Sequence, residues 1–144
     1  MCDGSHITQP QQPAMEATMR LALENAGVTA TDIDYINAHA TATLLGDPVE
    51  AAATRAVFGD KVPVSSTKGH TGHTLGACGA LETIFTVLMM RAGFVAATRN
   101  LTQIDEACQG IQHVQTPFEA ELKLAMNNNF AFGGVNTSLV IAAV

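Results

Sequence analysis

The spacing of apolar residues in the first part of the chain changes from helical to extended. Met15, Met19 and Leu23 recur every four residues and form one apolar stripe, which predicts a helix over residues 13–25. Residues 33–38 read as a strand. The first elements expected are therefore a helix and a strand.

A second helix and strand follow, and the helix is marked by residues typical of a helix start. Asp47 is expected to cap a helix that reaches residue 58, with Glu50 three residues past the cap as in a capping box. Residues 62–66 then read as a strand. The helix expected over residues 75–91 is apolar on almost every side, so we expect it to be buried rather than to lie on the surface.

The rest of the chain is rich in β-formers separated by turns. We predict strands at residues 94–98, 111–115, 123–130 and 138–144. Alternating strands and helices, followed by a cluster of strands, predict a three-layered α/β domain with a mixed sheet and a buried central helix. The 144 residues are enough for one domain with a substantial core.

Composition argues against several classes of protein. Hydrophobic residues make up 47% of the chain, which argues against disorder. The 7 basic and 13 acidic residues give a net charge of -6, and the basic residues are scattered singly, so no nucleic-acid-binding surface is expected. No run reaches the roughly 18 uncharged apolar residues of a membrane span, and the N-terminus lacks a signal pattern. A soluble, cytoplasmic protein without a membrane partner is predicted.

Two histidines follow two of the predicted strands. His39 comes just after the strand at residues 33–38, and His73 follows the strand at residues 62–66 in a glycine-rich stretch. Either histidine, considered alone, can equally be a hydrogen-bonded structural residue. Ligands of open α/β sheets bind at the carboxyl ends of the strands. We therefore expect the two turns to converge on one site.

Lys68 and Glu82 are the charged residues that flank this glycine-rich stretch. Glu82 falls in the helix expected to be buried, where a carboxylate is costly without a partner, and Lys68 is the natural candidate for that partner. His70 and His73 form an H-x-x-H pattern, but no acidic or cysteine cluster lies nearby, and the three cysteines are widely spaced. No metal site and no disulfide are expected.

An aromatic and glycine-rich segment lies near the end of the chain. Phe130 is expected in the core. Phe132 stands beside Gly133 and Gly134, whose backbone freedom suits a mobile gate over an apolar channel.

Taken together, three segments resemble the motifs of the β-ketoacyl-acyl-carrier-protein synthases, closest to the elongating, type II ketosynthases. Residues 37–43 (Asn-Ala-His-Ala-Thr-Ala-Thr) resemble the histidine motif of that family, residues 65–73 its lysine–histidine motif, and residues 130–136 its glycine-rich gating loop. The resemblance covers residues 1–144 as the C-terminal half of such an enzyme. It implies half of a thiolase-like α/β fold, completed by an N-terminal half that carries the nucleophilic cysteine.

The resemblance also implies a reaction. This is a decarboxylative Claisen condensation, in which an acyl group on a cysteine is extended by malonyl-acyl-carrier protein in fatty acid or polyketide elongation. By the same resemblance, His39 and His73 are the catalytic histidines, which donate hydrogen bonds to the malonyl thioester oxygen, and Lys68 and Glu82 are their supporting pair. The substrate-binding residues that it implies are Thr41 and Thr43, which hold the phosphopantetheine arm, and Phe130, Phe132, Gly133 and Gly134 of the gating loop.

Further expectations come from the resemblance. The partners are an acyl-carrier protein and the N-terminal half, and complete subunits form a dimer. The enzyme needs no cofactor besides the phosphopantetheine arm of the carrier. Residues 3–10 correspond to a second mobile loop near the entrance.

The chain departs from the family pattern at several positions. Ala40 and Ala42 stand in place of a glycine and a serine, Ala131 in place of a glycine and Val135 in place of a threonine. Cys78 occupies a position where the family usually has alanine, and no cysteine matches the nucleophile motif. We therefore expect the chain to be inactive alone.

Two alternatives belong to other classes. A non-catalytic half-fold that serves as a binding or scaffold partner would have no reason to keep a buried charge pair. A thiolase would carry a second catalytic cysteine near the C-terminal glycines, and the sequence has none there.

Overall fold

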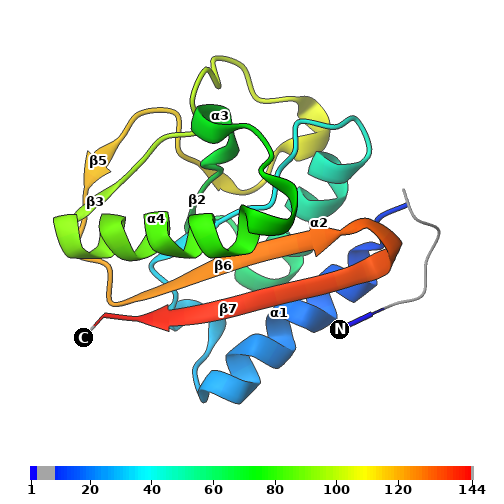
Figure 1. Cartoon of the computed structure of the whole chain (residues 1–144), viewed down its shortest axis with the longest axis horizontal. Coiled ribbons are helices and arrows are strands. Elements are labelled where there is room, and N and C mark those ends of the chain that lie inside the picture. Colours follow the sequence, from blue (N-terminus) through cyan, green and yellow to red (C-terminus); the bar gives the residue numbers. More distant parts are fainter. Residues whose placement is uncertain (3–8, 144) are drawn as a thin grey trace.

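The centre of the fold is a five-stranded sheet with the strand order β4-β2-β1-β6-β7. A computed structural model describes residues 1–2 and 9–143, and Figure 1 shows β6 and β7 running side by side across the molecule. Four strands run parallel to their neighbours and β7 runs antiparallel to β6, so the sheet is mixed, as predicted. The strands are β1 (Tyr35–Asn37), β2 (Pro63–Ser65), β4 (Gln112–His113), β6 (Leu124–Ala131) and β7 (Val135–Ala142).

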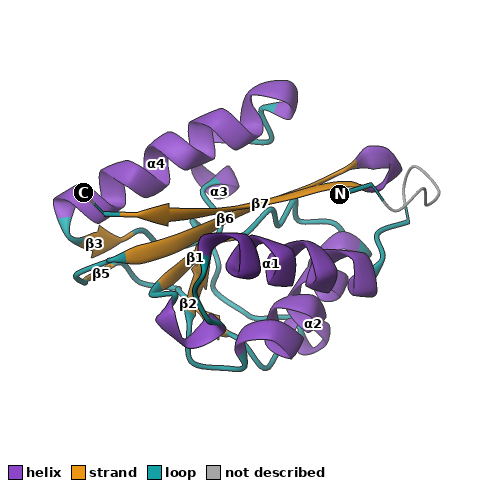
Figure 2. Cartoon of the chain, turned by 90° about the horizontal axis from the view of Figure 1, so that it is seen from below, coloured by secondary structure: helices purple, strands orange, loops and turns teal. Residues whose placement is uncertain are grey.

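Helices cover both faces of this sheet and make three layers. Figure 2 shows α1 (Gln12–Ala26) and α2 (Gly46–Phe58) on one face and α4 (Cys78–Ala92) on the other. The helix α1 ends at Gly27, whose φ of 68° is the left-handed conformation that glycine adopts at helix ends. The predicted three-layered α/β architecture is therefore confirmed.

Each side of the sheet has its own apolar core. Under α1 and α2, the core contains Met15, Met19, Ile36 and Met126, and Phe130 belongs to the same cluster. The second core lies under α4 and contains, among others, Tyr35, Met89, Val95, Val114, Leu122 and Ala125. The residues spaced by four in the first helix thus face the sheet, because that spacing repeats nearly once per helical turn.

The burial of α4 differs from the prediction. Its fully buried residues are Cys78, Glu82, Thr86 and Met89, which all face the sheet side, whereas Ile84 and Leu88 are 52% and 54% exposed. The prediction that this helix is buried rather than on the surface therefore holds for the side that faces the sheet and is wrong for the outer side within this chain, because only one layer packs against it. The segment Leu75–Ala92, with a mean hydropathy of 1.4, also has the length and composition of a membrane span, a test that core helices of soluble proteins pass as well.

The shorter elements differ from the sequence-based boundaries. The strand predicted at residues 94–98 is only β3 (Phe94–Val95), which pairs antiparallel with the unpredicted β5 (Phe118–Glu119) in a separate small sheet. The strand predicted at residues 138–144 begins earlier, at Val135, because β6 and β7 form a hairpin. Short helical turns account for the remaining elements: η1 (Ala30–Asp32), α3 (Lys68–Thr71), η2 (Leu75–Ala77), η3 (Glu106–Cys108) and η4 (Phe132–Gly134).

Candidate functional site

The structure brings His39 and His73 together. His39 lies two residues beyond the end of β1, and His73 follows α3 after the end of β2, which is the parallel neighbour of β1. The two imidazole rings meet edge to face with their centroids 5.2 Å apart. The prediction that the two histidine-bearing turns lie close together is therefore confirmed.

The turn that carries His39 is held by a carboxylate from α2. The backbone N–H of His39 donates to Oε1 of Glu50 at 2.8 Å, and the N–H of Ala40 donates to Oε2 at 2.7 Å. Glu50 is buried. The predicted capping box is not formed, because α2 starts at Gly46 and Asp47 therefore lies inside the helix rather than at its N-cap. Sequence reasoning missed this role, although the run of small apolar residues around Glu50 is a signal that this face of the helix is buried.

Burial keeps the imidazole of His39 neutral. The pKa of His39 is lowered to about 3, first by burial and then by the positive charge of Lys68 and by His73. A neutral imidazole has one N–H donor and one acceptor nitrogen. Nδ1 is buried without a hydrogen-bond partner within the residues described, and the ring lies 6.3 Å from the ring of Phe130.

His73 is exposed and its tautomer is fixed by the backbone. The N–H of Leu75 donates to Nδ1 of His73 at 3.3 Å, so the proton of a neutral ring lies on Nε2. Leu75 adopts a φ of 53°, a conformation uncommon for residues other than glycine. This backbone turn therefore leaves Nε2–H of His73 as the donor of the ring.

Lys68 and Glu82 form a buried ion pair, as predicted. Nζ of Lys68 lies 2.5 Å from Oε1 of Glu82, and 5% or less of each side chain is exposed. The contact joins the short helix α3 to α4. The thiol of Cys78, one turn before Glu82, has a raised pKa. Burial is the main cause, and the charges of Lys68 and Glu82 act on this pKa in opposite directions.

Two buried asparagines of the sheet form side-chain hydrogen bonds with α4 beside this pair. The side-chain N–H of Asn37 lies 3.3 Å from the hydroxyl of Thr86, and that of Asn127 donates to the hydroxyl of Thr83 at 3.0 Å. Both asparagines are almost fully buried. Sequence reasoning missed them because an asparagine within a predicted strand gives no sign of which face it occupies.

The residues predicted to bind substrate occupy two separate segments, the turn after β1 and the end of β6 with η4. The hydroxyl oxygens of Thr41 and Thr43 are 3.3 Å apart, and that of Thr43 accepts the N–H of Gly46. Phe130 is buried beside His39, whereas Phe132 is 72% exposed at the start of η4.

Gly133 and Gly134 both have a φ of 72°, so the segment that holds Phe132 uses the conformational freedom of glycine. Of the predicted second loop, residues 3–8 lie outside the described residues.

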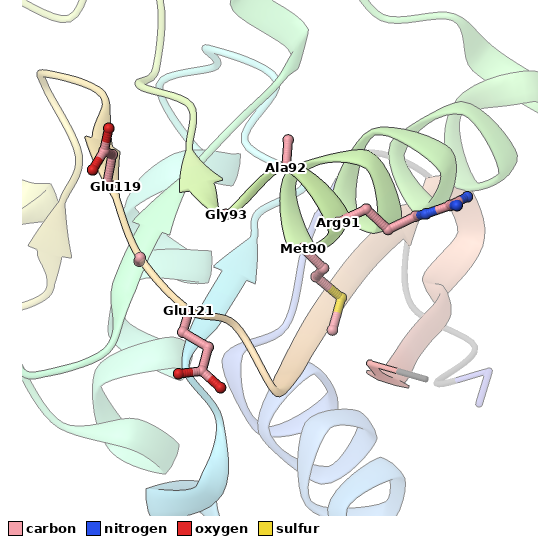
Figure 3. A pocket seen from close by; sticks show the side chains of 7 residues that line it. Met90, Arg91, Ala92, Gly93, Glu119 and Glu121 are labelled. Atoms are coloured by element: carbon pink, nitrogen blue, oxygen red, sulfur yellow. The ribbon is translucent and has the colours of Figure 1, made fainter.

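The described residues contain no group of three or more histidine, cysteine, aspartate or glutamate side chains placed to hold a metal ion. Nε2 of His70 instead lies 3.3 Å from the backbone oxygen of Ala97. Figure 3 shows a surface hollow of about 430 Å³ at the end of α4, where the side chains of Arg91, Glu119 and Glu121 point in different directions. This hollow has no convergent set of polar groups.

The mixed sheet, the helix layers and the two histidines beyond adjacent parallel strands agree with the thiolase-like class of fold. Residues 1–102 match the family described as Beta-ketoacyl synthase, C-terminal domain. The chain therefore belongs to the β-ketoacyl synthase family, whose members are acyltransferases.

Curated relatives agree with this assignment. The chain is 41% identical over 140 residues to 3-oxoacyl-[acyl-carrier-protein] synthase 1 of Escherichia coli K12. The aligned region covers 96% of the chain and 34% of that protein. It is 43% identical over 147 residues to 3-oxoacyl-[acyl-carrier-protein] synthase 2 of Coxiella burnetii, covering 99% of the chain and 36% of the relative. The chain thus spans about a third of the length of these relatives.

Solved structures show the same fold. A β-ketoacyl synthase from Burkholderia phymatum has a TM-score of 0.97 at 46% identity, covering 100% of this chain and 36% of that one. A ketosynthase in complex with its chain length factor from Xenorhabdus doucetiae has a TM-score of 0.93 at 35% identity. The match covers 99% of this chain and 37% of that one. The predicted thiolase-like fold is confirmed.

Proposed function

We propose that this chain is the histidine-bearing part of a 3-oxoacyl-acyl-carrier-protein synthase that catalyses decarboxylative condensation in fatty acid or polyketide elongation. The observation that carries this proposal is the pair of imidazoles, His39 and His73, with centroids 5.2 Å apart beyond two parallel strands. Two adjacent imidazoles that can each donate one hydrogen bond suit the stabilisation of a single oxygen that becomes negative in the transition state.

The described geometry supports a role for each histidine. Burial keeps His39 neutral at physiological pH. Its ring therefore carries one N–H group, which can donate a hydrogen bond to the substrate oxygen. Nδ1 of His73 accepts the N–H of Leu75, so Nε2–H of His73 is available to the same oxygen. Loss of carbon dioxide from a malonyl thioester leaves an enolate, and these two N–H groups would stabilise its oxygen.

The ion pair and the two turns complete the proposed site. Lys68 and Glu82 neutralise one another in the interior and hold the start of α4 next to α3. The hydroxyls of Thr41 and Thr43 share one hydrogen bond, so one of the two O–H groups remains free to donate to an amide oxygen of a phosphopantetheine arm. Phe132, exposed beside Gly133 and Gly134, would gate the acyl chain.

The proposed function requires partners. The nucleophilic cysteine and the cover for the exposed side of α4 would come from an N-terminal part of the enzyme, and the acyl groups from an acyl-carrier protein. A solved ketosynthase at 26% identity is in complex with a type II acyl-carrier protein, which supports a carrier partner. Complete subunits would form a dimer in the cytoplasm, with no cofactor besides the carrier's phosphopantetheine arm.

The test is a chimaera in which this chain replaces the matching region of the Escherichia coli synthase 1. Release of carbon dioxide from malonyl-acyl-carrier protein is measured. We expect activity in the chimaera, its loss in His39→Gln and His73→Ala, and no release by residues 1–144 alone. His70→Ala is the matched control, because His70 contacts the backbone of Ala97 rather than the site, and it should retain activity.

Two results would overturn the proposal. One is a chimaera that unfolds as cooperatively as the parent and still releases no carbon dioxide. The other is unchanged release in both histidine variants. A chimaera that binds malonyl-acyl-carrier protein without reacting would support the alternative, a non-catalytic binding or scaffold partner.

A further inference from the structure

A cavity of about 190 Å³ lies between α2, β2 and the segment that connects β3 to β4. It reaches the carboxyl ends of two parallel strands, where Ala38 follows β1 and Ser66 follows β2. Ligands of open α/β sheets bind at such strand ends. Neither imidazole of the candidate site lines this cavity, so it is a separate space behind the turn of His39.

The walls of this cavity are mostly apolar. Aliphatic side chains from α2, β2 and the neighbouring connections line it, among them Ala38, Ala40, Ala51, Val64, Leu101 and Ile104. Ala51 and Val64 are only 5% and 4% exposed. Because an apolar protein cavity of roughly 150 Å³ takes up benzene, the space here is large enough for a six-membered ring that carries one small substituent.

One edge of the cavity is polar and consists of hydrogen-bond acceptors. The carboxylates of Asp47, Glu50 and Asp105 lie there, and the thiol of Cys108 lies beside them. The pKa of this thiol is raised by burial first and then by the three carboxylates. An occupant with a negative charge would therefore be repelled, whereas one with a hydrogen-bond donor would find acceptors.

The state of these carboxylates favours an uncharged occupant over a cation. Each of the three already accepts at least one backbone N–H. An organic cation would lose its hydration among apolar walls, and partly engaged carboxylates would compensate that loss poorly. A single O–H donor needs only one lone pair, and a carboxylate offers about four acceptor positions.

We propose that this cavity is a second binding site, which takes an uncharged, ring-sized molecule with one hydroxyl group, such as a phenol. The ring lies against the aliphatic walls, and the hydroxyl donates to the carboxylates at the polar edge. The proposal does not depend on the proposed function. Because Ala38 and Ala40 flank His39 in the chain, the occupant adjoins the turn that carries this histidine.

The outer wall of the cavity gives the occupant a way in. Leu101, Ile104 and Cys108 of this wall belong to a connection whose regular structure is the short turn η3. The side-chain amide of Gln115 donates to the backbone oxygen of Leu101 at 3.2 Å, and Nε2 of His113 lies 2.8 Å from that of Cys108. A segment held by few contacts opens at a lower free energy than the strands beneath it.

Alkylation of Cys108 by iodoacetamide, followed by peptide mass spectrometry of the full chain, tests the proposal without any assay of activity. Phenol is the probe, and at saturation it should slow alkylation of Cys108 at least about fivefold, with half of the effect at a concentration on the order of millimolar or lower. Cys2 is the internal control, because it is exposed and does not line the cavity. Its alkylation should not change.

Two related molecules test the chemistry of the occupant. Benzoate has a similar size but a negative charge, so it should give no protection of Cys108. Toluene has a methyl group in place of the hydroxyl and leaves the carboxylates without a donor, so it should bind at least about threefold more weakly than phenol.

Filling the cavity should remove the effect of phenol. Ala51→Leu places a larger side chain in the cavity and should abolish the protection of Cys108. Ala52→Leu is the matched control, since Ala52 is the next residue of α2, is half-buried and does not line the cavity, and it should keep the protection. If Ala51→Leu does not unfold cooperatively, Ile104→Phe fills the cavity from its outer wall and gives the same test.

Backbone amide NMR signals locate the bound phenol independently of Cys108. Signals of Ala38 and Ala40 should shift with the same dependence on phenol concentration as the protection. Signals of Glu119 and Glu121, at the open hollow beside α4, should not shift.

Several results would overturn the proposal. They are a lack of protection by phenol, which would indicate a cavity filled by water only, and equal slowing of Cys2 and Cys108. Equal protection by benzoate or by toluene would contradict the proposed chemistry of the occupant. Protection that persists in the folded cavity-filling variants, or shifts at Glu119 and Glu121 instead of Ala38 and Ala40, would place the bound phenol elsewhere.

Discussion

Nζ of Lys68 lies 2.5 Å from Oε1 of Glu82, and this contact joins α3, which leads to His73, to the start of α4. Both side chains are buried. A buried charge without its partner is far less stable than the pair. The ion pair therefore couples the position of the turn that carries His73 to the helix that covers the sheet.

Removal of one member of this pair should destabilise the fold strongly. Glu82→Ala leaves the Lys68 charge buried and alone, so we expect a loss of about 3–5 kcal/mol in the free energy of unfolding, measured by chemical denaturation. Lys123→Ala is the control, since its pair with Glu121 is exposed and 3.9 Å long and should give no measurable change. A Glu82→Ala protein as stable as the parent would show that the pair is not buried in solution.

The neutral state of His39 predicts a pH dependence of stability. Its pKa of about 3 in the folded chain lies below the unfolded value of 6.5, so the contribution of neutral His39 is present above pH 6.5 and is lost as the pH falls towards 3. Between these values, the slope of unfolding free energy against pH should be shallower in His39→Gln by about one proton, or ~1.4 kcal/mol per pH unit.

Urea unfolding of parent and variant at several pH values measures this difference in slope. Glu50 does not interfere, because its raised pKa acts with the opposite sign and is common to both proteins. Equal slopes would mean that His39 titrates normally in the folded chain.

Phe130 at the end of β6 and Phe132 in η4 should respond differently to truncation. Phe130 is buried in the core, so Phe130→Ala should lower the free energy of unfolding by about 3–5 kcal/mol. Phe132 is 72% exposed, and Phe132→Ala should leave stability nearly unchanged. In the chimaera, it should alter the preference for acyl chain length. A large loss of stability in Phe132→Ala would place this ring in the core.

The three cysteines should react with a thiol reagent in the order of their exposure. Cys2 is exposed, Cys108 is partly buried and Cys78 is buried, and burial also raises the pKa of the Cys78 thiol. We expect an aromatic disulfide reagent to modify Cys2 first and Cys78 only after unfolding, as read by peptide mass spectrometry. Early modification of Cys78 would contradict its burial.

The exposed side of α4 should make the isolated chain associate. Ile84 and Leu88 are more than half exposed on one apolar helix, and such patches favour association. Light scattering at low micromolar concentration should show oligomers in the parent and fewer in Ile84→Glu with Leu88→Glu. Leu21→Glu, at a similarly exposed position of α1, is the control. A 15.0 kDa monomer that binds no apolar dye would contradict this prediction.

Local patterns in the sequence determined the helices, most strands and the segments that carry the candidate chemistry. The four-residue spacing of Met15, Met19 and Leu23 marks the buried stripe of α1, and the costly burial of a carboxylate predicted the partner of Glu82. These inferences succeed because periodicity and the need to pair a buried charge depend on few residues.

Apart from the pair of Lys68 and Glu82, the tertiary structure decided which polar groups meet across the fold. Glu50 has the local features of a helix-start residue, yet its carboxylate binds the turn of His39. The outer side of α4 carries Ile84 and Leu88, whereas the side that faces the sheet includes Glu82 and Thr86. Strand pairing and layer packing are long-range relations, so the same residue types fit either environment until the chain has folded.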